Sequence, residues 1–386
     1  MSEKPVFNMK TKLCACTIVL TWLAGVHQTP GQAVVINSFS QNGVLVCSGL
    51  QTGTVANVEW ASSVSGPWQT NWSGLTGVAV GQNGTISVSV PMFYRVLGVA
   101  APPGPPAGMT LIPAGPFTMG DTLDGEFDAM PTNVYISAFY MDTNMVTYSQ
   151  WQPVYAWAVN HGYDFDDVGS GTAADHPVQT VNWYDAVKWS NARSQQAGLT
   201  PVYYTDAGLT QVYTNGDVDL SSAKVNWAAN GYRLPTEAEW EKAARGGLSG
   251  QRFPWGNTLS QTQANYFGCI STCGFGYDLG PNGYSTNFDT GGSQAYTSPA
   301  GYFPPNGYGL HDMAGNMSAW CWDWYWTPYG QPTTNNPTGP PGPRTYHLLR
   351  GGNWSFYASN ARCAARFNSN PHDAVNYIGF RCVSRF

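Results

Sequence analysis

The chain has 386 residues, which is enough for two domains and a large hydrophobic core. Charged residues make up 10% of the chain and aromatic residues 14%, and the formal net charge is −6. Charged residues fall well below their usual share and no basic stripe is present, so the composition argues against a nucleic-acid partner. It favours a rigid, loop-rich protein with little helix.

Residues 1–33 are typical of a secretory signal peptide. Lys10 and Lys12 give a positive start, residues 13–26 form an apolar stretch too short for a confident membrane span, and residues 31–33 offer a small-residue cleavage site. An uncleaved anchor is the alternative interpretation. We expect an exported protein, periplasmic or extracellular, with no membrane attachment after cleavage and with disulfides permitted.

Residues 34–98 are predicted to form a small all-β, sandwich-like module. Asn83-Gly84 lies between strand-like residues 78–82 and 85–90 and predicts a hairpin, because Asn-Gly adopts the positive φ angles of a tight hairpin turn. The module could bind carbohydrate or another surface, but a spacer or stabilising role is the favoured interpretation.

Residues 99–108 are rich in proline and predict a stiff linker. The second domain then extends over residues 109–386. Residues 134–141 are strand-like, and so are residues 380–385, so we expect the first and last segments of this domain to lie close together. Residues 201–230 are expected to be an insertion on the outside of the core.

Three helix starts are marked in this domain. Thr147 and Thr236 each precede Gln or Glu by three residues, which is the capping-box spacing, and Asn182 is a further N-cap. Pro153 should disturb the first turns of the helix after Thr147. The glutamates after Thr236 are better explained by capping than by acid–base catalysis.

Six sequence motifs follow in order along the second domain. They include GYRLPTEAEWE at 231–241, and the others lie at 253–257, 305–310, 312–316, 336–341 and 350–354, the last continuing into 361–366 and 378–382. This set resembles the formylglycine-generating enzyme family, also called sulfatase-modifying factors. The resemblance implies an α+β fold related to C-type lectins, with little regular secondary structure.

The resemblance also implies an oxidase that acts on sulfatase cysteines, with copper held by two cysteines shortly after the double glycine. Here that window, residues 353–360, contains no cysteine. The family's tryptophan beside the substrate groove is replaced by Ser318, and its serine after the double glycine by Asn353. We therefore do not expect copper, and we name no catalytic residue. The candidate groove residues are Ser318, Trp320, Asn353, Trp354, Ser355, Phe356, Tyr357 and Arg366.

Two structural calcium sites are also implied by the resemblance, and oxygen ligands suit this hard cation. The ligands of the first would be Asn265, the backbone carbonyl of Tyr266, and Asp289. Those of the second would be Asp312, Gly315 and Asn316. The family's glutamate that completes the second site is replaced by Ala319, so we expect this second site to be weakened or empty.

Cys14 and Cys16 lie in the expected signal, which leaves six cysteines in the mature chain. Sequence alone does not fix their connectivity. We predict two disulfides, Cys269–Cys273 across a short loop and Cys363–Cys382 across neighbouring strands. In the vertebrate enzymes the cysteines matching the second pair bond to other partners, whose positions hold alanine or lie near Asn191 here.

These observations leave more than one function open. The favoured hypothesis is an exported relative that binds a protein or carbohydrate ligand through the old substrate groove. The alternative is a formylglycine-generating oxidoreductase or a related metal-dependent oxygenase. Neither the ligand nor the oligomeric state follows from the sequence.

Overall fold

The structure is a computed structural model that describes residues 34–39, 44–50, 52–61, 77–89, 93–98, 104–288, 297–327, 329 and 334–385. The expected signal peptide and residues 99–103 of the expected linker lie outside these residues. The chain divides into two compact units, Met1–Gly104 and Pro105–Phe386. None of the helices in the described ranges combines the length and apolar character needed to cross a bilayer.

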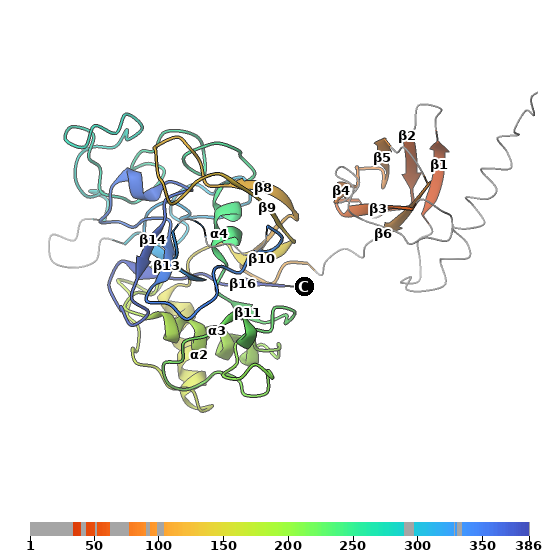
Figure 1. Ribbon diagram of the computed structural model, residues 1–386. Helices are drawn as coiled ribbons and strands as arrows, with labels where there is room; N and C mark the ends of the chain where they lie inside the picture. The colour runs from red at the N-terminus through yellow and green to blue at the C-terminus, as the bar shows by residue number, and fades with distance from the viewer. Residues whose placement is uncertain are drawn as a thin grey trace, which may run out of the picture. The chain divides into compact units, whose positions relative to one another are not determined.

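The first unit is all-β in its described part, and its strands form two three-stranded antiparallel sheets (Figure 1). One sheet has the order β1 (Val35–Phe39), β2 (Val44–Ser48), β5 (Ile86–Ser89). The other has the order β4 (Val78–Ala79), β3 (Val55–Ala61), β6 (Phe93–Gly98). Both sheets contribute to one hydrophobic cluster, which includes Leu45, Cys47, Ala56, Val58, Ile86 and Val88. Two sheets that share a core form the predicted sandwich-like module.

The predicted hairpin across Asn83-Gly84 is wrong in its pairing. The tight turn forms: Gly84 has a φ of 65°, and the Gly81 amide donates to the Thr85 carbonyl at 2.9 Å. However, β4 pairs with β3, whereas β5 pairs with β2. The turn carries the chain from one sheet to the other, because each strand finds its partner in a different sheet.

A four-stranded antiparallel sheet holds the ends of the second unit together. Its order is β11 (Tyr232–Arg233), β16 (Val383–Ser384), β10 (Phe139–Asp142), β7 (Met109–Ile112). Tyr140 on β10 lies opposite Ser384 on β16, so the first and last segments are neighbours, as predicted. The single strand expected over 134–141 is two strands, because β9 (Thr132–Ile136) pairs separately with β8 (Gly115–Met119).

A second four-stranded sheet carries two of the candidate groove residues, Ser318 and Trp320, on β12. Its order is β14 (Phe367–Ser369), β13 (His347–Arg350), β12 (Ser318–Trp324), β15 (Ile378–Gly379). β12 and β15 are parallel, whereas the other pairs are antiparallel. All seven residues of β12 are buried, so other parts of the unit cover both of its faces.

Three α-helices, α2 (Tyr148–Val159), α3 (Trp183–Gln196) and α4 (Glu237–Ala244), begin where the capping residues predict. Two short 3₁₀ helices, η1 (Ser222–Lys224) and η2 (Ala358–Ala361), complete the helical elements of the described chain. The Thr147 hydroxyl accepts from the Gln150 amide, and the Gln150 side chain accepts from the Thr147 amide. Pro153 lies inside α2 without ending it.

The core of the second unit lies mainly between these elements in two large clusters. One gathers around α2 and α3, which pack side by side (Figure 1), and the other around α4. The segment 201–230 is not an external insertion: Val202, Tyr203, Tyr213 and Leu220 are fully buried in the cluster around α3. Large aromatic and aliphatic side chains in this segment bury too much apolar surface to be left outside.

Candidate functional site

The double glycine Gly351-Gly352 follows β13 and turns the chain tightly. Both residues have positive φ angles, 94° and 67°. A Cβ on Gly351 would lie 3.0 Å from the Trp240 ring, and one on Gly352 would lie 2.9 Å from the backbone of Asn360. Glycine is the residue that tolerates both the backbone angle and the close approach, so the predicted tight turn is present.

A small polar cluster follows the turn. The Asn353 side-chain amide donates to the Ser318 hydroxyl at 3.0 Å. The Asn353 side-chain oxygen accepts from both the backbone amide and the hydroxyl of Ser355, each at 3.0 Å. Ser318 and Asn353, two of the positions where this chain departs from the family, are therefore hydrogen-bond partners. Their side chains are buried and fix the backbone that carries the rest of the site.

Four aromatic side chains lie next to this cluster, and we call them the aromatic surface: Phe267, Tyr284, Trp354 and Tyr357. Their rings contact in sequence: Trp354 lies 5.8 Å from Tyr284, Tyr284 lies 4.8 Å from Phe267, and Phe267 lies 5.7 Å from Tyr357. Tyr284 and Tyr357 are 37% and 43% exposed. Trp354 is buried and Phe267 is half-buried, so these two rings support the exposed rings of Tyr284 and Tyr357 from beneath. Exposed rings that are held rigidly in this way suit recognition of a ligand.

Two members of the aromatic surface were not found by sequence reasoning. Phe267 and Tyr284 lie in a loop, 84 and 67 residues before Gly351. The loop is tied to the site by backbone hydrogen bonds from Phe267 to the Phe356 carbonyl and from Asn316 to the Asn265 carbonyl, at 2.9 Å and 2.7 Å. No local pattern in this loop indicates that pairing.

The remaining predicted groove residues have other surroundings. Trp320 is fully buried in the core, and its indole donates to the Val181 carbonyl. Phe356 is half-buried, with its ring against Phe367 and Tyr377. Trp320 therefore supports the strand β12 rather than a ligand contact.

Arg366 is committed to an internal ion pair. Its guanidinium donates to both oxygens of the Glu237 carboxylate at 2.5 and 3.0 Å, and to the backbone carbonyls of Asp128 and Trp326. Its charge and its donors are thus used to join the segment before β14 to α4 and two loops, and the side chain is buried. The guanidinium N–H groups of Arg366 named above are therefore not free to bind a ligand at the aromatic surface.

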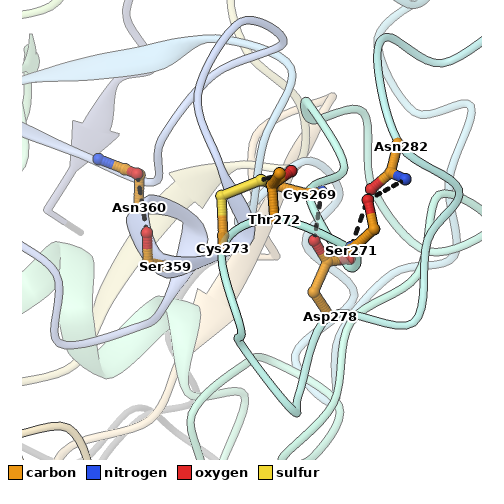
Figure 2. The surroundings of a disulfide bond; sticks show 8 residues. All are labelled: Cys269, Ser271, Thr272, Cys273, Asp278, Asn282, Ser359 and Asn360. Atoms are coloured by element: carbon orange, nitrogen blue, oxygen red, sulfur yellow. Dashed lines mark hydrogen bonds between the residues drawn. A yellow bond between two sulfur atoms is a disulfide. The ribbon is translucent and has the colours of Figure 1, made fainter.

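The predicted Cys269–Cys273 disulfide is present (Figure 2). The Cys269 amide donates to Asp278 at 2.8 Å, which anchors the loop, and the picture places Ser359 and Asn360 of η2 in the same surroundings. The disulfide therefore closes a loop beside the segment that follows the double glycine.

The predicted Cys363–Cys382 disulfide is wrong, since both cysteines are free and buried. Cys363 belongs to the hydrophobic cluster around α4, whereas Cys382 belongs to the cluster around α3, where its sulfur lies 3.6 Å from the Ser190 hydroxyl. Their side chains thus enter different parts of the core.

Several oxygens of the second implied calcium site are used in hydrogen bonds within the protein. The Asn316 side-chain oxygen accepts from the Ser298 amide, and its backbone oxygen accepts from the Trp354 amide. The Gly315 carbonyl accepts from the Met317 amide. Asp312 accepts from the Gly301 amide through one oxygen only, and burial raises its pKa. Ala319 adds no oxygen, whereas the other Asp312 carboxylate oxygen is buried and accepts no hydrogen bond from the described residues, so calcium at this weakened second site stays a prediction.

For the first implied calcium site the described residues give a partial picture. Asn265 is buried and the Tyr266 carbonyl accepts from the Gln261 side chain at 3.1 Å. Asp289, the expected carboxylate, lies outside the described residues. Calcium at this site stays a prediction.

One cluster of metal-ligating groups was missed. Ligand atoms of Asp166, Asp217 and His372 lie within 4.8 Å of one another on the surface. They come from three loops far apart in the sequence, so no spacing pattern reveals them. Lys188, whose ammonium lies 4.0 Å from Asp217, already balances part of this negative charge.

Comparison with known proteins agrees with this fold. The chain matches the sulfatase-modifying factor enzyme 1-like domain over residues 98–386. Among solved structures it is similar to Treponema denticola variable protein 1, with a TM-score of 0.53 and 27% identity over 76% of this chain and 96% of that one. CarF gives the same TM-score and identity over 73% of this chain and 99% of that one.

Curated relatives point the same way. The chain is 34% identical over 302 residues to formylglycine-generating enzyme from Bos taurus, which covers 73% of this chain and 76% of the relative. It is 32% identical over 305 residues to formylglycine-generating enzyme from Thermomonospora curvata, which covers 72% of this chain and 93% of the relative. The chain therefore belongs to the sulfatase-modifying factor family and has its α+β, C-type-lectin-related fold.

Proposed function

We propose that this chain is an exported family member that binds a protein or carbohydrate ligand at the aromatic surface and does not perform copper-dependent cysteine oxidation. The observation that carries the proposal is the chemistry of the segment after the double glycine. There the chain has Asn353 and Ser355, which hydrogen-bond to each other, and aromatic rings in edge-to-face contact, in place of the two thiols that copper requires. Soft Cu(I) prefers thiolate ligands, and none of these side chains replaces them.

The free cysteines of the described second unit give further support. Cys321, Cys363 and Cys382 are buried. Burial raises the pKa of the Cys363 and Cys382 thiols to about 12 and that of Cys321 well above its ordinary value. With these raised pKa values the three thiols stay protonated at neutral pH. Because the thiolate is the form that binds metal, they do not replace the missing cysteine pair.

Ligand binding is tested with an array of peptides and glycans. For any ligand that the full chain binds, Tyr357→Ala should weaken binding at least tenfold, since an exposed aromatic anchor carries an above-average share of binding energy. Tyr302→Ala is the matched control, because Tyr302 is also an exposed tyrosine and has no ring contact with the aromatic surface. Equal loss in both variants, or none in either, would contradict the proposal.

The alternative function is a formylglycine-generating oxidoreductase or a related metal-dependent oxygenase. The identity to formylglycine-generating enzymes over three quarters of the chain favours it. Metal content separates the two. Calcium alone, from the first implied site, fits the binding function, whereas copper or iron near one equivalent fits the oxidoreductase.

A further inference from the structure

We propose that the second unit has another binding site, a cavity at the start of α4 that takes a small hydroxyl-rich carboxylic acid of the uronic acid type. The cavity has a volume of about 280 Å³. That is at the lower end of the range for small-molecule pockets, about 300–1,000 Å³. Its lining includes no residue of the aromatic surface, so this site is separate from the one proposed above.

The cavity wall carries more positive than negative side-chain charge. Two guanidinium groups, those of Arg233 and Arg385, line the cavity with one carboxylate, that of Glu239. Arg233 binds both oxygens of Glu239, at 2.6 and 2.7 Å, and the Thr236 amide donates to the same carboxylate at 2.9 Å. Glu239 is therefore already engaged, and one positive charge is left over.

That remaining charge belongs to Arg385. Within the described residues its guanidinium has no hydrogen-bond or ion-pair partner, although the side chain is half-buried. Burial lowers the pKa of Arg385, and the nearby Arg233 lowers it further, while Glu239 acts in the opposite direction. A partly desolvated guanidinium is stabilised by a carboxylate, which it binds through two parallel hydrogen bonds. The positive end of α4, whose N-cap Thr236 also lines the cavity, favours the same sign of ligand.

The rest of the wall suits a hydroxylated ring. Ser222 and Thr338 contribute hydroxyl groups, and Trp227 contributes an aromatic side chain. The side-chain amide of Asn336, which also lines the cavity, is held by hydrogen bonds with Ser137 and Asn335 and shapes the wall. The Trp227 indole nitrogen is fixed by a hydrogen bond to the Ser222 hydroxyl at 3.0 Å. Small polar groups around one aromatic ring match a ligand that has both hydroxyls and an apolar ring face, and Arg385 selects an acidic member of that class.

The experiment is isothermal titration of the full chain with sodium D-glucuronate, with D-glucose and sodium sulfate as comparison ligands. We expect glucuronate to bind with a Kd of about 1 mM or tighter, and glucose and sulfate to bind at least tenfold more weakly. No binding of glucuronate would overturn the proposal. Equal binding of glucose would show that Arg385 does not select the acid, and equal binding of sulfate would show a general oxyanion site, so both would overturn it too.

Two variants locate the site. Arg385→Gln should weaken glucuronate binding at least tenfold, and Thr338→Val, which keeps the shape and removes one hydroxyl, should weaken it by a smaller factor. Arg344→Gln is the matched control, because Arg344 is also half-buried and does not line the cavity. Unchanged binding in Arg385→Gln, or the same loss in Arg344→Gln, would overturn the proposal. If the uronic-acid proposal fails, the proposal of ligand binding at the aromatic surface still stands, because the two sites share no residue.

Discussion

The glutamates of the motif at 231–241 form buried ion pairs within the second unit. Each glutamate of the motif at 231–241 has an arginine partner: Glu237 pairs with Arg366, Glu239 with Arg233, and Glu241 with both Arg245 and Arg350. These pairs are buried and join α4 to β11, β13 and the segment before β14. The charges of this motif are thus structural, which agrees with the sequence-based choice of capping over acid–base chemistry.

The buried carboxylate of Glu241 is the centre of this network. Glu241→Gln would leave Arg245 and Arg350 buried without a full counter-charge, so the free energy of unfolding should fall by about 3–5 kcal/mol. Urea unfolding measures the change. Asp175→Asn is the control, since Asp175 is exposed, and it should stay close to the parent protein. A fall of the same size in the control would contradict this account.

Asp323 should give the second unit a pH-dependent stability. Burial first, and then repulsion from Glu237, raise the pKa of this carboxyl from 3.8 to about 8 in the folded protein. A carboxyl whose folded pKa is above its unfolded value contributes stability that is full below the unfolded pKa and is lost as pH rises through the folded pKa. The loss should therefore fall between about pH 4 and pH 8.

Asp323→Asn removes this titration and keeps an oxygen that can accept from the Glu237 amide, as Asp323 does at 2.6 Å. The stability of the variant minus that of the parent should therefore increase from pH 5 to pH 8. Urea unfolding across this pH range measures the difference. A difference that is flat, or that decreases with pH, would contradict a folded pKa of Asp323 above its unfolded value.

At the scale of elements, short sequence patterns correctly predicted the helix starts, because neighbouring residues determine those starts. The starts of α2, α3 and α4 were found because each N-cap and its partner lie three residues apart. The pairing of β4 and β5 with different sheets, the split of 134–141 into β9 and β10, and the burial of 201–230 were not found. Those features depend on partners distant in the sequence, such as Cys47 on β2 opposite Ile86 on β5.

The N-cap of α2 offers a direct test of this local reasoning. Thr147→Ala removes the hydroxyl that accepts from the Gln150 amide, and it should lower the free energy of unfolding by about 1 kcal/mol. Thr147→Ser keeps the hydroxyl and should lose much less. Thermal unfolding of both variants gives the comparison, and similar losses in the two would mean that the cap does not stabilise this helix.

At the scale of the whole molecule, the ordered motifs were enough to predict the family and the fold, because they fix helix caps, tight turns and buried ion pairs together. They were not enough to predict the complete site. Ser318 and Asn353 were identified from their departure from the family, but Phe267 and Tyr284 reach the site only through loop packing. The prediction of a Cys363–Cys382 disulfide was wrong for a similar reason. Strand-like spacing does not show which of the two hydrophobic clusters a side chain enters.

The central claim is that this chain keeps the family's scaffold without the thiol pair that binds copper. It is tested by adding Cu(I) to the reduced, purified chain and then offering a Cys-x-Pro-x-Arg peptide in the presence of oxygen. Copper retention and conversion of the peptide cysteine to formylglycine are measured by metal analysis and mass spectrometry. The account predicts that no copper is retained near the double glycine and that the peptide is unchanged. One equivalent of retained copper together with turnover of the peptide would contradict it.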